Sequence, residues 1–293
     1  MIKGSIVALV TPFDEAGSVD HSRLRELINW HIDEGTDAIL VLGTTGETPA
    51  LSEEEQDEIV RTAVAESRGR VPIIANSGCN NTEKTIAKSI RYEKMGADAL
   101  LVITPYYNKP NKSGMKEHFT RTADAVGIPV YIYNVPARTG ICIDAETVGE
   151  LSKHPNIAGI KEASGDMSYV AKISKFAGDD FCIYSGNDDI TIAIMSMGGM
   201  GAVSVWANIM PDKVHEMTTA FLSGDTEAAK KIQLKYLNLI NALFCETNPV
   251  PVKSFMEMAG MGAGGCRLPL GPLSSASRRV LSSLCEDFMG ESD

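Results

Sequence analysis

The chain has 293 residues, of which 44% are hydrophobic and 22% are charged, as in an ordinary globular protein. Its formal net charge of −11 disfavours binding to nucleic acids or to anionic membrane surfaces, because like charges repel. The six cysteines show no CxxC spacing, so we expect reduced thiols and no zinc site. The N-terminal residues carry no recognisable targeting signal. Together these features predict a cytoplasmic protein.

Eight short apolar runs rich in β-branched residues recur along the chain. They are Ser5–Val10, Ala38–Leu42, Val71–Ala75, Ala99–Ile103, Val130–Tyr133, Ile157–Ile160, Phe181–Tyr184 and Gly201–Val205. The runs are continuously apolar and do not alternate with polar residues, which is typical of parallel strands covered on both faces. A stretch with helical patterning follows each run, so the sequence predicts eight β-α units.

The stretches between the runs also carry helix signals. Asp20–Glu34 places its leucines and isoleucines on one face, and Thr82–Lys94 shows the same spacing. Ser52 and Glu55 have the spacing of a capping box, which marks a helix start. Eight units spaced roughly 25–30 residues apart favour a (β/α)₈ barrel over an open doubly wound sheet.

Helical patterns continue beyond the last apolar run. They cover Asp212–Leu222, Asp225–Phe244, Val250–Met258 and Pro272–Phe288. We therefore predict a catalytic barrel over residues 1–224 and an added C-terminal helical subdomain over residues 225–293. No low-complexity linker separates the two parts, so we expect the subdomain to pack on the barrel.

One stretch approaches the length of a membrane span without any charge. It runs from Ile190 to Pro211. Glycines at its centre, among them Gly198 and Gly199, break helices. A buried helix end, a turn and a buried strand explain this stretch better, so we predict no membrane association.

Active sites of such barrels lie at the carboxyl ends of the strands, so we expect the functional residues there. The second run is followed by Gly43-Thr44-Thr45-Gly46-Glu47. Backbone N–H groups in such a turn can hold an anion, and the two hydroxyls add donors. A plain glycine-rich turn is the alternative, and the segment lacks the pattern of a nucleotide-binding P-loop.

Aromatic and basic residues follow two further runs. Tyr133 ends the fifth run and shares its facing with Tyr131, so we expect it to point into the barrel mouth. Arg138 lies in the loop that follows, and a guanidinium suits a carboxylate ligand. Tyr106 and Tyr107 follow the fourth run, where packing on the outer helices is the alternative.

A lysine and two small or apolar residues end the last three runs. Lys161 directly follows the sixth run. Burial there disfavours its ammonium form and makes the free amine available for imine formation with a keto acid. Gly186 gives a ligand access to the backbone, and Val203 offers an apolar wall. Considered alone, Lys161 is better explained as a surface lysine. The other candidate residues at the same end of the barrel favour a Schiff-base site.

Two other patterns are set aside. Residues 260–265 match GxGxxG but follow a predicted helix, so a helix-connecting loop is a better interpretation than a dinucleotide site. None of the five histidines falls at a strand end beside a nucleophile, which disfavours a Ser-His-Asp hydrolase.

These motifs resemble those of the dihydrodipicolinate synthase family, within the N-acetylneuraminate lyase superfamily. They are GTTGE at 43–47, TPYYNKP at 104–110, YNVPARTG at 133–140 and GIKEASGD at 159–166. The resemblance runs from about Gly4 to the C-terminal helices. It implies condensation of pyruvate with L-aspartate 4-semialdehyde to 4-hydroxy-tetrahydrodipicolinate, a step of diaminopimelate and lysine biosynthesis. It also implies a homotetramer of tight dimers, with no metal and no organic cofactor.

The resemblance implies the catalytic roles. Lys161 would form the imine with pyruvate. Thr44 and Thr45 would hold the pyruvate carboxylate and start a proton relay, in which Tyr133 would be the main acid and base. Tyr107 would complete this relay in the active site of a neighbouring subunit.

It also implies the substrate contacts. Arg138 would bind the carboxylate of the semialdehyde, while Gly186 and Val203 would lie around the keto acid. Sugar-acid lyases of the superfamily typically lack an arginine in this loop, so Arg138 favours the synthase. Two alternatives stay open at this point: a sugar-acid aldolase, and a non-catalytic barrel that responds to keto acids.

The chain departs from the family pattern in two places. The third run is followed by Asn76-Ser77-Gly78, where relatives usually read Gly-Thr-Gly. In lysine-inhibited relatives, histidines and an acid form the feedback site; here Glu53 and Gln56 replace the histidines and Lys84 replaces the acid. A cation at position 84 repels the ammonium of free lysine, so we expect weak or absent feedback.

Overall fold

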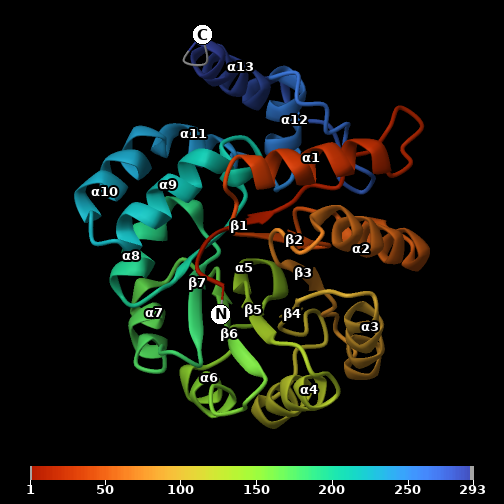
Figure 1. Ribbon diagram of the computed structural model, residues 1–293, viewed down its shortest axis with the longest axis vertical. Helices are drawn as coiled ribbons and strands as arrows, with labels where there is room; N and C mark the ends of the chain where they lie inside the picture. The colour runs from red at the N-terminus through yellow and green to blue at the C-terminus, as the bar shows by residue number, and fades with distance from the viewer. Residues whose placement is uncertain (1, 291–293) are drawn as a thin grey trace.

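The predicted barrel is present in the computed structural model, which describes residues 2–290. Eight parallel strands pair in chain order, and β8 returns to β1 to close the barrel. The strands are β1 (Gly4–Ala8), β2 (Ala38–Val41), β3 (Ile73–Asn76), β4 (Ala99–Ile103), β5 (Val130–Asn134), β6 (Ile157–Glu162), β7 (Cys182–Ser185) and β8 (Gly201–Ser204). Figure 1 shows them inside a ring of helices. The predicted fold class is confirmed.

Both faces of the barrel strands are buried, which explains why the runs are continuously apolar. One set of side chains, including Ile6, Leu40 and Leu101, fills the barrel interior. The alternate residues, such as Val7 and Ile39, pack against the surrounding helices in a second cluster. Because neighbours along a strand point to opposite faces, both faces favour apolar residues.

The outer helices alternate with the strands. They are α1 (His21–Asp33), α2 (Glu53–Ser67), α3 (Thr82–Lys94), α4 (Lys112–Asp124), α6 (Ala145–Leu151), α7 (Met167–Ser174), α8 (Thr191–Ser196) and α9 (Pro211–Leu222). The capping box predicted at the start of α2 is confirmed. Glu55 donates its N–H to Ser52 Oγ at 3.2 Å, and Ser52 donates its N–H to the Glu55 carboxylate at 2.9 Å. These bonds satisfy N–H groups that a helix start leaves free.

Short helical turns follow several strands on the mouth side of the barrel. They are η1 (Thr48–Ala50), α5 (Pro136–Thr139), η2 (Asp188–Ile190) and η3 (Trp206–Asn208). The charge-free stretch 190–211 consists mainly of α8, β8 and η3, so the interpretation as a buried helix, turn and strand is confirmed. Within residues 2–290, no helix combines the length and the apolar character needed to cross a membrane.

Four helices follow the barrel. They are α10 (Thr226–Lys235), α11 (Leu237–Ala242), α12 (Val250–Met258) and α13 (Ser275–Gly290). The continuous helix predicted over Asp225–Phe244 is wrong, because the backbone leaves helical geometry at Tyr236, with φ −97° and ψ 6°. This break lets α11 turn against η2 while α10 packs on α9. The glycine-rich segment 260–265 lies between α12 and α13, so its interpretation as a helix-connecting loop is confirmed.

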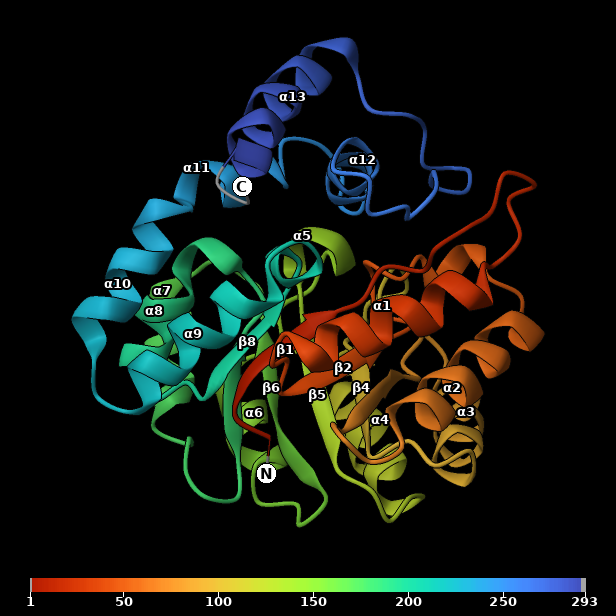
Figure 2. The same ribbon diagram turned by 45° about the horizontal axis from the view of Figure 1, so that its top comes forward.

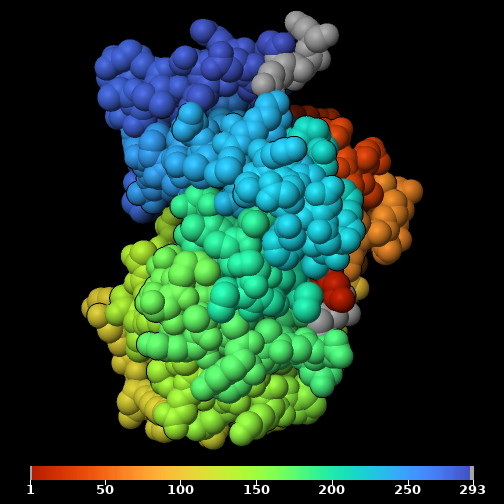
Figure 3. All heavy atoms as spheres, turned by 90° about the vertical axis from the view of Figure 1, so that its left-hand side faces the viewer, coloured from red at the N-terminus to blue at the C-terminus, as the bar shows by residue number. Residues whose placement is uncertain are grey.

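The last two helices, α12 and α13, lie on the mouth side of the barrel (Figure 2). Figure 2 shows α12 and α13 beyond the end of the barrel at which α5 lies. On the face seen in Figure 3 they form one continuous surface with the barrel. The placement brings residues from the end of the chain close to the loops that follow the strands. The exact boundary between residues 224 and 225 stays a prediction.

Candidate active site

Lys161 and Tyr133 lie side by side at the carboxyl ends of β6 and β5. They are register partners in the sheet, and Lys161 Nζ lies 4.4 Å from the centre of the Tyr133 ring. Lys161 is only 6% exposed and Tyr133 5%. Tyr131 and Tyr133 both belong to the interior cluster, as their predicted common facing requires. The amine is therefore held against an aromatic face and largely removed from water.

Val203 meets Lys161 inside the barrel. Both line a small cavity of about 10 Å³, together with Leu101 and Tyr131 from the interior cluster. A space of this size holds no more than one water molecule, so the barrel interior is packed below the lysine. A substrate must therefore approach from the mouth.

Gly186 brings the backbone after β7 against the lysine stem. A Cβ atom at this position would lie 3.1 Å from Lys161 Cε and 2.7 Å from the Ala163 side chain. Its N–H donates to Glu162 O at 2.7 Å, which fixes the close approach. Only glycine fits here without displacing its neighbours, as the predicted backbone access requires.

The turn Gly43–Glu47 lies at the end of β2. The Gly46 N–H donates to Gly43 O at 3.0 Å, and the Glu47 N–H donates to Thr44 O at 3.1 Å. Thr45 is buried, and Thr44 is half-buried. The two inner bonds give the segment a compact shape with its hydroxyls at the barrel mouth, which suits a carboxylate.

Asn248 is a site residue that the sequence analysis missed. It lies just before α12, and its Nδ2 donates to Thr45 Oγ1 at 3.0 Å. Its backbone carbonyl accepts from Arg138 Nη2 at 3.1 Å. One residue from the C-terminal segment thus touches both the threonine turn and the predicted carboxylate clamp. The available signal in the sequence was the run Asn248–Lys253, in which a lysine interrupts an otherwise apolar helical pattern.

Arg138 and Tyr107 are the exposed members of the predicted set. Arg138 lies on α5 with its side chain largely open to solvent. Tyr107 is 90% exposed, and its φ of 68° lies in the left-handed region that non-glycine residues usually avoid. The described chain therefore brings Lys161, Tyr133, Gly186 and Val203 together, and it leaves Tyr107 directed to solvent.

Two buried carboxyl groups belong to the strand ends around the lysine. Glu162 follows Lys161 on β6, and its Oε2 accepts from Asn134 Nδ2 at 2.7 Å; burial raises the pKa of its carboxyl. Asp188 in η2 accepts from the Val205 N–H at 2.9 Å. Burial raises the pKa of Asp188, while its hydrogen bonds and the charge of Lys161 oppose that rise.

Asn76 marks one departure from the family pattern. It pairs in register with Leu101, a residue of the barrel interior, and is 9% exposed. Its Oδ1 is buried without a hydrogen-bond partner. The neighbouring Ser77 Oγ is bonded to Ser89 Oγ at 2.8 Å, and this bond ties the strand end to α3. The structure gives no account of why asparagine stands at position 76.

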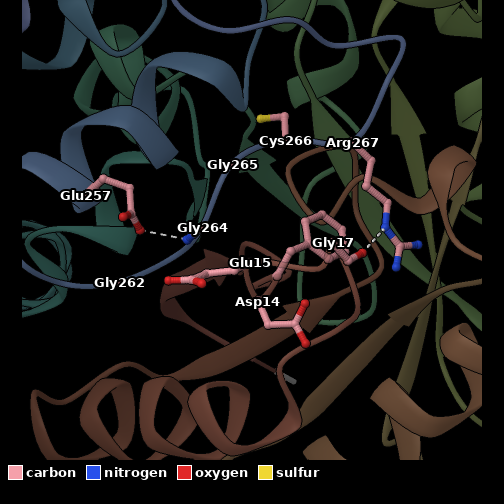
Figure 4. A pocket seen from close by; sticks show the side chains of 10 residues that line it. Asp14, Glu15, Gly17, Glu257, Gly262, Gly264, Gly265, Cys266 and Arg267 are labelled. Atoms are coloured by element: carbon pink, nitrogen blue, oxygen red, sulfur yellow. Dashed lines mark hydrogen bonds between the residues drawn. The ribbon is translucent and has the colours of Figure 1, made fainter.

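A larger hollow lies away from these residues. It has a volume of about 560 Å³ and opens between the loop after β1 and the loop after α12 (Figure 4). None of the predicted site residues lines it. Its lining includes the carboxylates of Asp14, Glu15 and Glu257, which outnumber the single guanidinium of Arg267 and so disfavour an anionic keto acid. The strand ends, and not this hollow, therefore carry the candidate chemistry.

The fold and the residues at its mouth are those of a (β/α)₈-barrel enzyme of the Schiff-base-forming class. Comparison with known families is more specific. Residues 1–287 match the Dihydrodipicolinate synthetase family, and the chain belongs to this family. The expected family is thus confirmed.

Individual relatives agree with this assignment. The 4-hydroxy-tetrahydrodipicolinate synthase of Thermoanaerobacter sp. (strain X514) is 51% identical over 289 residues, which cover 98% of this chain and 97% of that protein. The crystal structure of dihydrodipicolinate synthase from Aquifex aeolicus is 41% identical, with a TM-score of 0.95 and 98% coverage of both chains. A structure described as a monomeric dihydrodipicolinate synthase variant is 35% identical, with a TM-score of 0.95, and covers 98% of this chain and 96% of its own.

Proposed function

We propose that this chain is a 4-hydroxy-tetrahydrodipicolinate synthase, which condenses pyruvate with L-aspartate 4-semialdehyde through an imine on Lys161. The observation that carries this proposal is the buried amine of Lys161 beside Tyr133 at the barrel mouth. The names of the curated relatives support it over nearly the full chain. They do not favour a sugar-acid aldolase or a keto-acid-responsive regulator.

The reaction begins when the neutral amine of Lys161 attacks the keto carbon of pyruvate, and loss of water leaves an imine. Once protonated, the imine withdraws electrons from the adjacent methyl group, so a methyl proton leaves and an enamine forms. The enamine carbon attacks the aldehyde carbon and makes the new carbon–carbon bond. The amino group of the former semialdehyde then attacks the imine carbon, which closes the ring and releases Lys161.

The surrounding residues take the remaining roles. We assign proton transfer during imine formation and cyclisation to Tyr133, whose ring lies against the lysine amine. Thr44 and Thr45 bind the pyruvate carboxylate from their compact turn, with Thr44 starting the proton relay. Arg138 binds the carboxylate of the semialdehyde.

Gly186 and Val203 shape the space around the imine. Gly186 exposes backbone beside the lysine stem, and Val203 supplies an apolar wall. All the proposed steps use groups of the chain itself, without a metal or an organic cofactor. The six free cysteines are in line with a cytoplasmic location.

We also propose that Tyr107 acts in the active site of a second copy of this chain. Its 90% exposed ring and left-handed backbone are costly for an isolated subunit. A homotetramer of tight dimers would account for both features, because Tyr107 would cross the tight interface and contact the neighbouring subunit. Since a monomeric variant is known among related structures, sedimentation velocity must establish the state of this chain.

Reductive trapping tests the central step. Borohydride treatment in the presence of pyruvate should reduce the imine and leave a stable adduct, which peptide mass mapping should place on Lys161. Lys253 is an internal control, because it is also buried but donates to three acceptors. The Lys161→Met variant should give no adduct. An adduct on another residue, or none on the native chain, would overturn the proposal.

A further inference from the structure

A buried ion pair joins the C-terminal segment to the threonine turn. Lys253 Nζ in α12 lies 2.9 Å from Glu47 Oε1, and each side chain is 1% exposed. The lysine also donates to Thr11 O at 2.9 Å and to Gly265 O at 2.6 Å. The second carboxylate oxygen of Glu47 accepts from the Arg267 N–H at 2.8 Å. The three donors of the ammonium are therefore all used within the protein.

Glu47 needs an external constraint to hold its conformation. Its φ of 54° lies in the left-handed region, which costs a non-glycine residue roughly 1 kcal/mol or more. The same residue donates its N–H to Thr44 O at 3.1 Å. Any relaxation of the Glu47 backbone therefore moves Thr44. The bond to Lys253 opposes this relaxation.

The C-terminal segment holds the turn at a second point. Asn248 Nδ2 donates to Thr45 Oγ1 at 3.0 Å, and Asn248 directly precedes the α12 region that carries Lys253. The segment therefore contacts the turn next to both threonines. A helix that contributes no reacting group nevertheless fixes the part of the site assigned to the pyruvate carboxylate.

We propose that Lys253 is a positioning residue of the pyruvate site, which acts through Glu47 to hold the turn Gly43–Glu47 in its carboxylate-binding conformation. This inference rests on the proposed function. Lys253 lies behind the turn and does not touch the substrate. Its loss should therefore weaken pyruvate binding and leave the chemistry of Lys161 comparatively intact.

Arg267 provides a matched control from the same C-terminal loop. Its guanidinium is bonded to the Glu55 carboxylate at 2.6 Å and to Gly17 O at 2.9 Å, and Figure 4 shows the latter bond. Arg267→Met removes these contacts between the loop and the barrel. It retains the backbone N–H of residue 267, from which the Glu47 carboxylate accepts a hydrogen bond. This variant should lose stability without disturbing the turn.

The test compares Lys253→Met, Arg267→Met and the double variant Lys253→Met/Glu47→Gln with the native chain. Steady-state kinetics with pyruvate varied give KM and kcat, and thermal unfolding gives Tm. The native chain must first show synthase turnover, and its absence would count against the proposed function itself. We expect Lys253→Met to raise KM for pyruvate roughly 10- to 100-fold, with a smaller change in kcat. Arg267→Met should change KM less than about twofold.

The double variant separates positioning from stability. Breaking one half of a buried ion pair leaves an uncompensated charge, whereas removing both charges relieves that cost. We therefore expect the double variant to recover most of the Tm lost by Lys253→Met while its KM stays high. It also carries the test if Lys253→Met does not fold. A KM that recovers together with Tm, or a native KM in the double variant, would overturn the positioning role.

Discussion

Arg138 is the residue to which we assign the choice of aldehyde substrate. Arg138 is an exposed residue, and one hydrogen bond of 3.1 Å from its Nη2 to the Asn248 carbonyl orients the guanidinium. Arg138→Ala should raise KM for the semialdehyde roughly 10- to 100-fold, because a charge-assisted contact is worth about 1.5–3 kcal/mol. Imine formation with pyruvate should survive, since Lys161 and Tyr133 keep their contact.

Steady-state kinetics with each substrate varied in turn will measure this separation, and borohydride trapping will report the imine. Arg138→Lys is the control. It keeps the positive charge but loses the planar guanidinium, so its KM for the semialdehyde should fall between those of the native chain and Arg138→Ala. Unchanged kinetics for the semialdehyde in Arg138→Ala would refute the role assigned to Arg138.

Individual site residues differ in how well the sequence predicts them. Lys161 and Tyr133 could be found because each ends an apolar run, and the ends of parallel strands meet at one face of a barrel. Asn248 could not be found in this way. Its contact with Thr45 joins residues 203 positions apart, and only the folded course of the C-terminal segment creates that contact.

At the scale of elements, α2 and α3 determine the expected response to free lysine. Glu53 on α2 is bonded to Arg91 at 3.2 Å. The buried amide oxygen of Gln56 accepts from Lys88 Nζ at 2.8 Å. Lys84 on α3 is exposed and adds a positive charge. Glu53 is thus engaged by an arginine, and the charge of Lys84 repels an ammonium group, so we expect weak or absent inhibition by lysine.

Synthase assays over a range of lysine concentrations will measure this response. Lys84→Glu is the informative variant, because reversal of one charge should increase sensitivity to lysine without changing KM for pyruvate. An exposed position such as Lys172 on α7 supplies the matched charge reversal, Lys172→Glu, which should have no effect. Strong inhibition of the native chain at low lysine would contradict the expectation.

Elements with their own local signals were predicted well, and elements that depend on tertiary contacts were not. The α2 start follows from its capping box, and α3 has the predicted bounds Thr82–Lys94. The short helix α5 has too few residues to show helical periodicity. The break at Tyr236 lies within a continuous helical pattern, and packing of α11 against η2 accompanies it.

At the scale of the whole molecule, the barrel and the C-terminal segment form one functional unit. The sequence predicts that they pack together, because no linker separates them. It does not predict that the segment reaches the mouth and holds the threonine turn through Asn248 and Lys253. Truncation before Asn248 should therefore remove part of the candidate site as well as part of the core.

Global stability should fall in mild acid because of a histidine buried in α1. His31 is 0% exposed, and neither ring nitrogen has a hydrogen-bond partner. Burial lowers the pKa of His31 from 6.5 to about 3. Between these two values the unfolded chain binds a proton that the folded chain does not, so the free energy of unfolding decreases as pH falls. The loss from His31 alone should be roughly 2 kcal/mol between about pH 6.5 and about pH 5.

Urea unfolding of the native chain and of His31→Leu at several pH values will isolate this effect, because the other titrating groups are common to both. The variant should show a smaller decrease in its free energy of unfolding over this pH range. His118 offers an independent check: burial lowers its pKa to about 4, so His118→Leu should also reduce the pH dependence. The folded-state pKa of His118 is lowered less than that of His31. As pH falls, the loss of stability due to His118 should therefore be complete at a higher pH than the loss due to His31. Parallel pH profiles for the native chain and His31→Leu would show that His31 does not govern acid stability.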